Sequence, residues 1–244
     1  MNAPLREAPR VAKSSTLAEQ AYAGLKRDIL SGELAPGLAL RLEFLKQRYQ
    51  LSFTPLREAL NRLHSERLVD SVALKGFRVA PLSLKEMQDS MSVRTLIDCE
   101  ALRRSIAHAT DDWETQIVAA LHALDLVTRR NGAEALQASY DEVEQRHLAL
   151  HRALIAACDS RWLLELSATL YIQTERYRRP MLKTSVRRDS SRDVSKEHHE
   201  IVDATLRRET DLAVSLLAEH YNRTTQLIEA SLTGQAEAQD MTGS

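Results

Sequence analysis

The longest part of the chain, from residue 83 to about residue 232, has the apolar spacing of helices and contains no segment typical of strands. With only 7 glycines and 6 prolines in 244 residues, few positions interrupt a helix. The pattern predicts helices at about 83–109, 112–130, 132–157, 160–178, 189–208 and 210–231, with a break at "RNGAE" between the second and third. An all-α antiparallel helical bundle over residues 81–232 is the expected architecture.

The first third of the chain has a different pattern. Residues 1–15 are polar and are expected to form a disordered arm. A helix capped by Ser15 or Thr16, a short helix and a third helix that starts at Thr54 and Pro55 are followed by two β-prone runs around Lys75 and Gly76. We therefore expect a winged helix-turn-helix over residues 16–80 and a mainly α protein. The polar residues 233–244 are expected to be a disordered tail.

Charge and cysteine content narrow the class of protein. Residues 1–80 hold 13 Lys and Arg against 8 Asp and Glu, whereas the remainder holds 20 against 26. A basic module joined to an acidic one suggests that the first meets an anionic polymer. Cys99 and Cys158 have no CxxC spacing, no signal peptide is visible, and the longest apolar run has six residues. A cytoplasmic protein that does not enter the membrane is expected.

The third helix has the pattern of a DNA-recognition helix. If its apolar stripe packs inward, the opposite face presents Thr54, Arg57 and Asn61. Arg57 could bridge guanine O6 and N7, and Asn61 could reach adenine N6 and N7. Lys75 and Arg78 on the hairpin suit phosphates or a minor groove. Each feature alone is more typical of a solvated helix face than of a DNA contact, but their order on the basic part of the chain favours double-stranded DNA.

The segment "SFTPLREALNRL…ERLV…KGFRVA" resembles the DNA-binding domain of the GntR superfamily. Thr54, Pro55, Arg57, Glu58, Ala59, Leu60 and Gly76 match the pattern of that family. Phe53 stands where most members carry a base-contacting arginine, so apolar contact with thymine methyls or sugar is expected there instead, and Arg67 replaces a usual glycine. The resemblance and the helix face together predict these DNA-contacting residues: Ser52, Phe53, Thr54, Arg57, Asn61, Lys75, Gly76 and Arg78.

Four histidines in the helical part fall on apolar helix faces. His147 and His151 share a face with Leu154, while His198 and His220 lie on two later helices. A single buried histidine is usually a hydrogen-bonded core residue. Four that converge in a bundle would need several buried partners, whereas one cation would satisfy all of them. Imidazole ligands favour Zn²⁺, with Ni²⁺ possible, over Mg²⁺ or Ca²⁺.

The order and spacing of these histidines resemble the FCD effector-binding domain of the FadR-type branch. That branch carries Asp-x-x-Phe-His, then Glu-His-x-x-Ile, then a histidine 22 residues on, and His147 stands where aspartate or asparagine is usual. The resemblance implies a divalent cation with a small effector beside it. Glu144 could supply an oxygen ligand, and Arg94 and Asp98, in "VRTLIDCEAL", are expected near the effector. The arginines and lysines between residues 176 and 192 form a basic cluster. We expect most of this cluster to be a solvated helix end and loop, with one member able to reach the pocket.

The segments "EQRHLALHRALIAACDSRWLLEL" and "ERYRR" are similar to the carbon-starvation-induced repressor group, whose effectors are small dicarboxylates such as glutarate. We therefore expect a homodimeric transcriptional regulator, a repressor rather than an enzyme. Its affinity for operator DNA is expected to change when a small carboxylate or dicarboxylate binds. Two alternatives remain open. One is a metal-dependent enzyme fused to a DNA-binding module, and the other is a constitutive DNA-binding protein with a structural zinc site.

Overall fold

The chain divides into two compact units, one ending at Ala80 and the other starting at Pro81. The computed structural model describes residues 15–135, 140–181 and 192–242. The expected N-terminal arm lies almost entirely outside the described residues.

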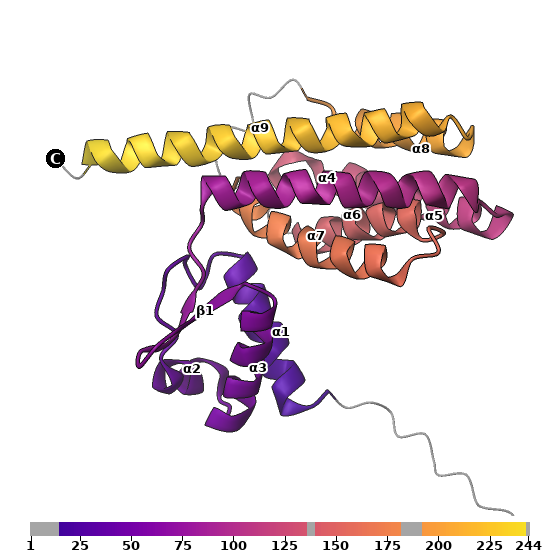
Figure 1. Ribbon diagram of the computed structural model, residues 1–244. Coiled ribbons are helices and arrows are strands. Elements are labelled where there is room, and N and C mark those ends of the chain that lie inside the picture. Colours follow the sequence, from indigo (N-terminus) through magenta and orange to yellow (C-terminus); the bar gives the residue numbers. More distant parts are fainter. Residues whose placement is uncertain (1–14, 136–139, 182–191, 243–244) are drawn as a thin grey trace, which may run out of the picture. The chain divides into compact units, whose positions relative to one another are not determined.

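The N-terminal unit is a winged helix-turn-helix, which confirms the predicted fold class (Figure 1). Three helices precede a two-stranded antiparallel hairpin. The elements are α1 (Leu17–Leu30), α2 (Leu42–Tyr49), α3 (Phe53–Ser65), β1 (Val69–Val72) and β2 (Gly76–Val79).

Helices α1 and α3 form where an N-cap residue is followed by an apolar stripe with helical spacing. Thr16 and Glu19 make a reciprocal capping box at the start of α1, so the predicted helix start is confirmed. The stripe predicted on α3 is fully buried and packs against α1. The start of α3 differs from the prediction: Ser52, not Thr54, is the N-cap, and Pro55 still lies in the first turn, where its missing N–H is tolerated.

The hairpin closes through a turn in which Leu74 and Gly76 both have positive φ, 61° and 84°. Glycine adopts this conformation without steric cost, which explains its place at the start of β2. The register pairs Val69 with Val79 and Val72 with Gly76.

The C-terminal unit is a helical bundle (Figure 1). Helix α4 packs along α9 and also contacts α6 and α7, while α5 packs against α6 and α8. The bounds are α4 (Leu84–Ala107), α5 (Asp111–Ala135), α6 (Tyr140–Ile155), α7 (Arg161–Met181), α8 (Val194–Leu206) and α9 (Thr210–Thr242). In the part of the chain that the structure describes, no helix has the length and apolar character needed to cross a membrane.

Two predicted boundaries in this unit are wrong. Helix α5 continues through the expected break, since one glycine costs a helix only about 1 kcal/mol and alanine and glutamate follow it. Helix α9 continues to Thr242, through most of the segment expected to be a disordered tail. That segment is polar but rich in Ala, Gln and Glu, which favour helix even where no apolar face exists.

Candidate functional site

Helix α3 presents an exposed polar face on the N-terminal unit. The side chains of Thr54, Arg57 and Asn61 are exposed, and within the described residues they make no hydrogen bond or ion pair. Ser52 is also exposed and makes no side-chain capping hydrogen bond. Phe53 is half-buried under the Lys46 ammonium, which lies 5.1 Å from the ring centre. A helix face with its donors available is what base recognition requires.

The hairpin carries the remaining predicted DNA-contacting residues. Lys75 is exposed beside Gly76 at the turn. Arg78 is exposed but forms an ion pair with Asp70 across the strands, at 3.1 Å. Its guanidinium is therefore partly neutralised on the surface where contact with phosphate was predicted.

The four predicted histidines converge in the C-terminal unit. His147 and His151 come from α6, His198 from α8 and His220 from α9. One ring nitrogen from each lies within 4.8 Å of those of the other three. Ligands of a tetrahedral zinc ion stand roughly 3.3 Å apart. The arrangement is therefore a slightly open form of a four-nitrogen cation site.

The outer nitrogens of three of these rings are held by neighbouring side chains. His147 Nδ1 lies 2.7 Å from Tyr171 Oη, and His151 Nδ1 lies 3.1 Å from Tyr221 Oη. His220 Nδ1 lies 2.8 Å from the Glu197 carboxylate. Partners of this kind orient histidine ligands in metal sites and leave Nε2 available to the ion.

His198 gives the most direct indication of a missing partner. Its Nε2 is buried and, within the described residues, has no hydrogen-bond partner. Unpaired buried polar atoms are costly and rare in native proteins. The Nε2 atoms of His147 and His151 also face each other at 3.1 Å. A cation between these rings would resolve both features, so the donor set fits a divalent metal.

The histidines are electrostatically suited to this role. Burial, followed by the neighbouring histidine and arginine side chains, holds the pKa of His147 and that of His151 well below the usual range. Burial does the same to the pKa of His198 and lowers that of His220. Neutral imidazole is the form that binds metals.

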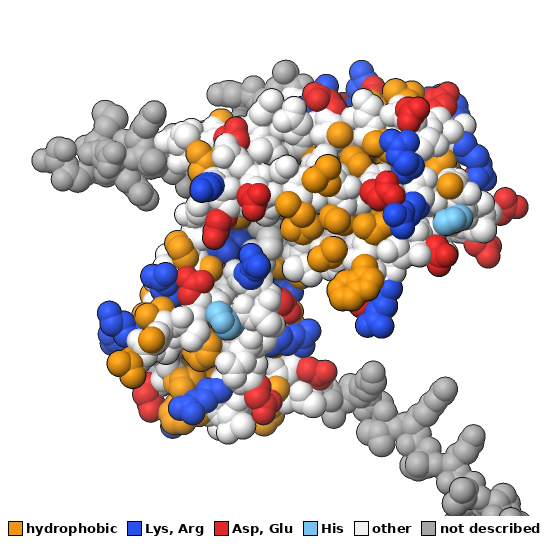
Figure 2. All heavy atoms as spheres, in the orientation of Figure 1, with side chains coloured by type: hydrophobic (Ala, Val, Ile, Leu, Met, Phe, Trp, Pro, Cys, Tyr) orange, Lys and Arg blue, Asp and Glu red, His pale blue; other side chains and the backbone are white. Residues whose placement is uncertain are grey.

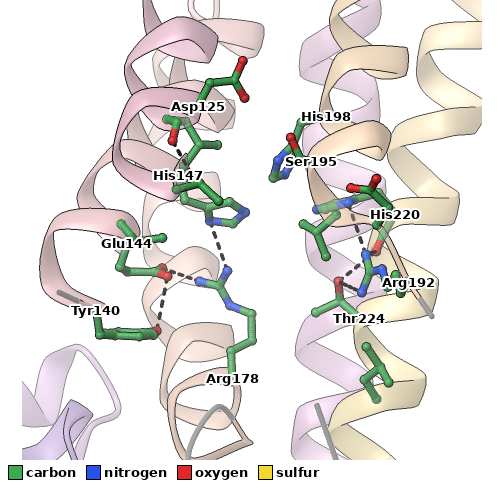
Figure 3. Close-up of a pocket in the computed structure, with 16 residues that line it drawn as sticks. Asp125, Tyr140, Glu144, His147, Arg178, Arg192, Ser195, His198, His220 and Thr224 are labelled. Atoms are coloured by element: carbon green, nitrogen blue, oxygen red, sulfur yellow. Dashed lines mark hydrogen bonds and ion pairs between the residues drawn. The ribbon is translucent and has the colours of Figure 1, made fainter. Parts of the chain in front are cut away.

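A cavity of about 440 Å³ opens beside the cluster (Figure 3). His147 faces it from one side, and His198 and His220 face it from the other. Aliphatic side chains of α5, α6, α8 and α9 complete the lining: Leu124, Val143, Val194 and Leu227.

Arginines stand on opposite walls of this cavity (Figure 3). Arg178 of α7 is bound to Glu144 at 2.5 Å, and its Nη1 lies 3.2 Å from His147 Nδ1. Arg192, just before α8, binds Glu197 at 2.6 Å and donates to the His220 carbonyl. Hydrogen bonds from Arg192 hold the pKa of Glu197 far below its usual range despite burial. Two members of the basic cluster thus reach the pocket, where one was expected.

Other predicted effector residues lie elsewhere. Arg94 and Asp98 do not line the cavity; they form a buried ion pair at 3.2 Å behind His151. Glu144 lines the cavity, but its carboxylate does not belong to the cluster of four histidine nitrogens. It is bound to Arg178 and Tyr171 instead. Members of the basic cluster between 182 and 191 lie outside the described residues.

Comparison with known proteins identifies both units. Residues 17–79 match the bacterial regulatory proteins of the gntR family, and residues 89–223 match the FCD domain. The chain belongs to the GntR family and carries an FCD domain. It is therefore a transcriptional regulator. The matched families are regulators rather than enzymes, so the enzyme alternative is not supported.

Individual relatives agree with this assignment. The chain is 36% identical over 86% of its length to the uncharacterized HTH-type transcriptional regulator BphR of Paraburkholderia xenovorans, covering 84% of that protein. It is 34% identical over 87% of its length to the HTH-type transcriptional repressor GlaR of Escherichia coli, covering 96%. The fold resembles that of E. coli McbR/YncC, with a TM-score of 0.71 at 16% identity over 90% of this chain and 100% of that one.

Several residues at the site were not found from the sequence. Tyr171, Tyr221 and Glu197 hold the histidine rings; the two tyrosines carry no motif, and Glu197 belongs to the Glu-His-x-x-Ile motif but was not assigned this role. Glu197 and Tyr221 each adjoin a predicted histidine in the chain, and this adjacency was the available signal. Tyr171 lies 20 residues from the nearest such histidine, and only the packing of α6 on α7 brings them together.

Proposed function

We propose that this GntR-family regulator is a cytoplasmic repressor whose operator binding is controlled by a small carboxylate beside a divalent cation in the C-terminal unit. One observation carries the proposal. Four imidazole nitrogens converge at the edge of a cavity that has a guanidinium on each wall. A cation and two arginines form a recognition site for anions.

The cation would be held by His147, His151, His198 and His220, and Zn²⁺ is the expected ion. Four neutral nitrogen donors suit Zn²⁺ or Ni²⁺ better than Mg²⁺, which prefers oxygen. When bound, the ion supplies positive charge and a Lewis-acidic position for a carboxylate oxygen.

Charge balance supports an anionic effector. Arg178 pairs with Glu144 and Arg192 with Glu197 inside the site. A divalent cation bound by neutral histidines would leave a net excess of positive charge next to the cavity. A carboxylate, or a dicarboxylate that spans the two walls, would neutralise it, and the aliphatic lining would contact the carbon chain.

DNA contact is assigned to the exposed face of α3 and to the hairpin. Arg57 and Asn61 are suited to base edges, and Lys75 to phosphate. Ser52, Phe53, Thr54, Gly76 and Arg78 complete the proposed surface.

The protein is proposed to act as a homodimer through an exposed apolar face on α4 and α7. We define this face by Val93, Leu96, Trp162 and Leu166, whose exposed fractions are 40%, 69%, 75% and 44%. Apolar side chains gather over these two helices (Figure 2). A patch of this kind marks a protein interface, and a single winged helix contacts too few base pairs for a specific site.

Metal analysis and effector titration test the proposal together. Protein purified without chelator should contain about one divalent cation per chain. Small mono- and dicarboxylates should then raise its melting temperature and change its affinity for operator DNA. His198→Ala should remove both the cation and the response, because it deletes a ligand.

His199→Ala is the matched control. His199 is adjacent in the chain but 44% exposed, and it bonds to Asp125 outside the cluster. It should leave metal content and effector response unchanged. Wild-type protein without a divalent cation would contradict the cation site. A bound cation with no carboxylate response would favour a constitutive DNA-binding protein with a structural metal.

A further inference from the structure

Arg94, expected from the sequence to bind the effector, lies instead between two aromatic rings. Its guanidinium carbon is 4.6 Å from the ring centre of Tyr171 and 4.5 Å from that of Tyr221. The side chain is 2% exposed. Stacking of a planar guanidinium on two tyrosine faces is favourable and fixes the position of both rings.

Hydrogen bonds lock the guanidinium in this position. Nε donates to Asp98 at 3.2 Å, Nη1 to Thr174 at 2.8 Å and Nη2 to Tyr221 Oη at 3.2 Å. All three nitrogens are thus engaged by buried groups on α4, α7 and α9. Arg94 has no face turned to the cavity beside the histidines.

The two tyrosines that sandwich Arg94 are those that hold His147 and His151. Tyr221 Oη donates to Asp98 at 2.7 Å, so its lone pairs are left to accept from His151 Nδ1. Tyr171 Oη donates to Glu144 at 2.5 Å and lies 2.7 Å from His147 Nδ1. For His151 the hydroxyl therefore accepts from Nδ1–H, which assigns the free lone pair of that imidazole to Nε2. His147 Nδ1 is also 3.2 Å from Arg178 Nη1, so Tyr171 helps to orient this ring without fixing its tautomer.

We propose that Arg94 is a positioning residue for the cation site. By aligning Tyr171 and Tyr221 it sets the orientation of His147 and His151 and the tautomer of His151. It thereby ties two ligands to α4, the helix that directly follows the DNA-binding unit in the chain. This inference rests on the cation site of the proposed function and adds a residue that contacts neither the ion nor the effector.

Cobalt binding by full-length variants tests this role. Co²⁺ reports its ligand geometry through its visible absorption, and its affinity is measured by competition with a chromophoric chelator. Arg94→Met should lower Co²⁺ affinity by about 10- to 100-fold, as loss of outer partners does in other metal sites, and should alter the absorption spectrum. Arg94→Lys should also lose affinity, because an ammonium cannot stack on two rings and donate in a fixed fork.

Matched variants separate positioning from general destabilisation. Arg103→Met removes an exposed arginine of the same helix, whose one ion pair within the described residues is with Asp211 at the surface, and it should leave affinity and spectrum unchanged. Tyr221→Phe keeps the ring but removes the hydroxyl, so it should lower Co²⁺ affinity even if Arg94→Met does not fold. Circular dichroism of the chelator-treated proteins checks that each variant is folded.

The outcomes are distinguishable. If folded Arg94→Met binds Co²⁺ with wild-type affinity and spectrum, Arg94 does not position the site. If it also loses its response to carboxylates, Arg94 contacts the effector instead. Absence of Co²⁺ binding by the wild-type protein would overturn the cation site of the proposed function, and this inference with it.

Discussion

The identity of the side chain at position 147 determines the charge of the candidate cation site. The resemblance to FCD domains predicts a carboxylate or an amide at this position, whereas His147 makes the cluster one of four imidazoles. Its Nδ1 is held by Tyr171, and its Nε2 faces His151. Burial keeps such a ring neutral by lowering its pKa. The donor set therefore carries no negative charge, which leaves the charge of a bound cation available to an anion.

The buried histidines predict a pH-dependent stability for the metal-free protein. Their pKa values are lowered in the folded state, whereas in the unfolded chain they lie near ~6.5. Below that pH the unfolded chain binds protons that the folded chain does not. As the pH is lowered below this value, the free energy of unfolding should therefore decrease by about 1.4 kcal/mol per pH unit for each such histidine.

Urea denaturation of chelator-treated protein at pH values from about 5 to 7 measures this slope. His151→Asn should reduce it, whereas His199→Ala should leave it unchanged. A stability that does not depend on pH in this window would show that the cluster is protonated or hydrated in the folded protein.

Arg57 is the residue on which specific DNA binding should depend most. It is exposed on α3 and, among the described residues, has no partner. Arg57→Ala should weaken operator binding by about 1–3 kcal/mol through loss of a guanine contact, with metal content unchanged.

Arg62→Ala is the control for charge. Arg62 lies on the same helix but stacks on Tyr22 at 3.6 Å, so it should affect sequence discrimination little. Titrations against operator and random DNA distinguish the two variants. Equal losses on both DNAs for Arg57→Ala would mean that this residue contacts phosphate rather than bases.

At the scale of elements, a buried carboxylate joins α1 to α2. Asp28 of α1 accepts hydrogen bonds from Arg48 and Tyr49 of α2, at 2.8 and 2.7 Å. Despite burial, these partners and Arg27 hold the pKa of Asp28 below its usual value. Helix α2 buries a single apolar side chain, Leu45, so its attachment depends strongly on these polar contacts.

Asp28→Ala should therefore destabilise the N-terminal unit by about 2–3 kcal/mol, since it leaves a tyrosine hydroxyl and a guanidinium without their acceptor. Denaturant unfolding followed by circular dichroism measures the change. Asp70→Ala, which removes an exposed carboxylate from the hairpin, should cost less than about 0.5 kcal/mol. If both variants cost the same, α2 is held mainly by apolar contact.

At the scale of the whole molecule, the exposed apolar face of α4 and α7 is the surface through which we propose that two chains associate. Leu96 is 69% exposed and Trp162 75% exposed, values that are unfavourable for a monomer in water. A two-fold dimer formed through this face would present two winged helices to a palindromic operator.

Leu96→Glu should convert the dimer to a monomer, because a carboxylate would be buried opposite its own copy. Sedimentation velocity measures the mass, and operator affinity should fall about tenfold or more with it. Val118→Glu places the same charge on an exposed apolar position of α5 and should leave the dimer intact. If both variants remain dimeric, another surface forms the interface.

The sequence alone determined the helical bundle, the winged helix-turn-helix and the four histidines. These features depend on local periodicity, on caps and on the apolar face of each separate helix, all of which can be read along the chain. Where local signals conflict, as at the glycine within α5 and in the polar end of α9, the prediction was wrong because propensity summed over a turn outweighs one residue.

Only the tertiary structure decided which side chains surround the histidines. Arg94 and Arg178 could not be assigned in advance, because the packing of α4, α6, α7 and α9 determines which arginine faces the cavity and which is stacked between tyrosines. Such contacts join residues up to 127 positions apart in the chain. Periodicity shows that a side chain points inward, whereas its partner depends on how whole helices cross.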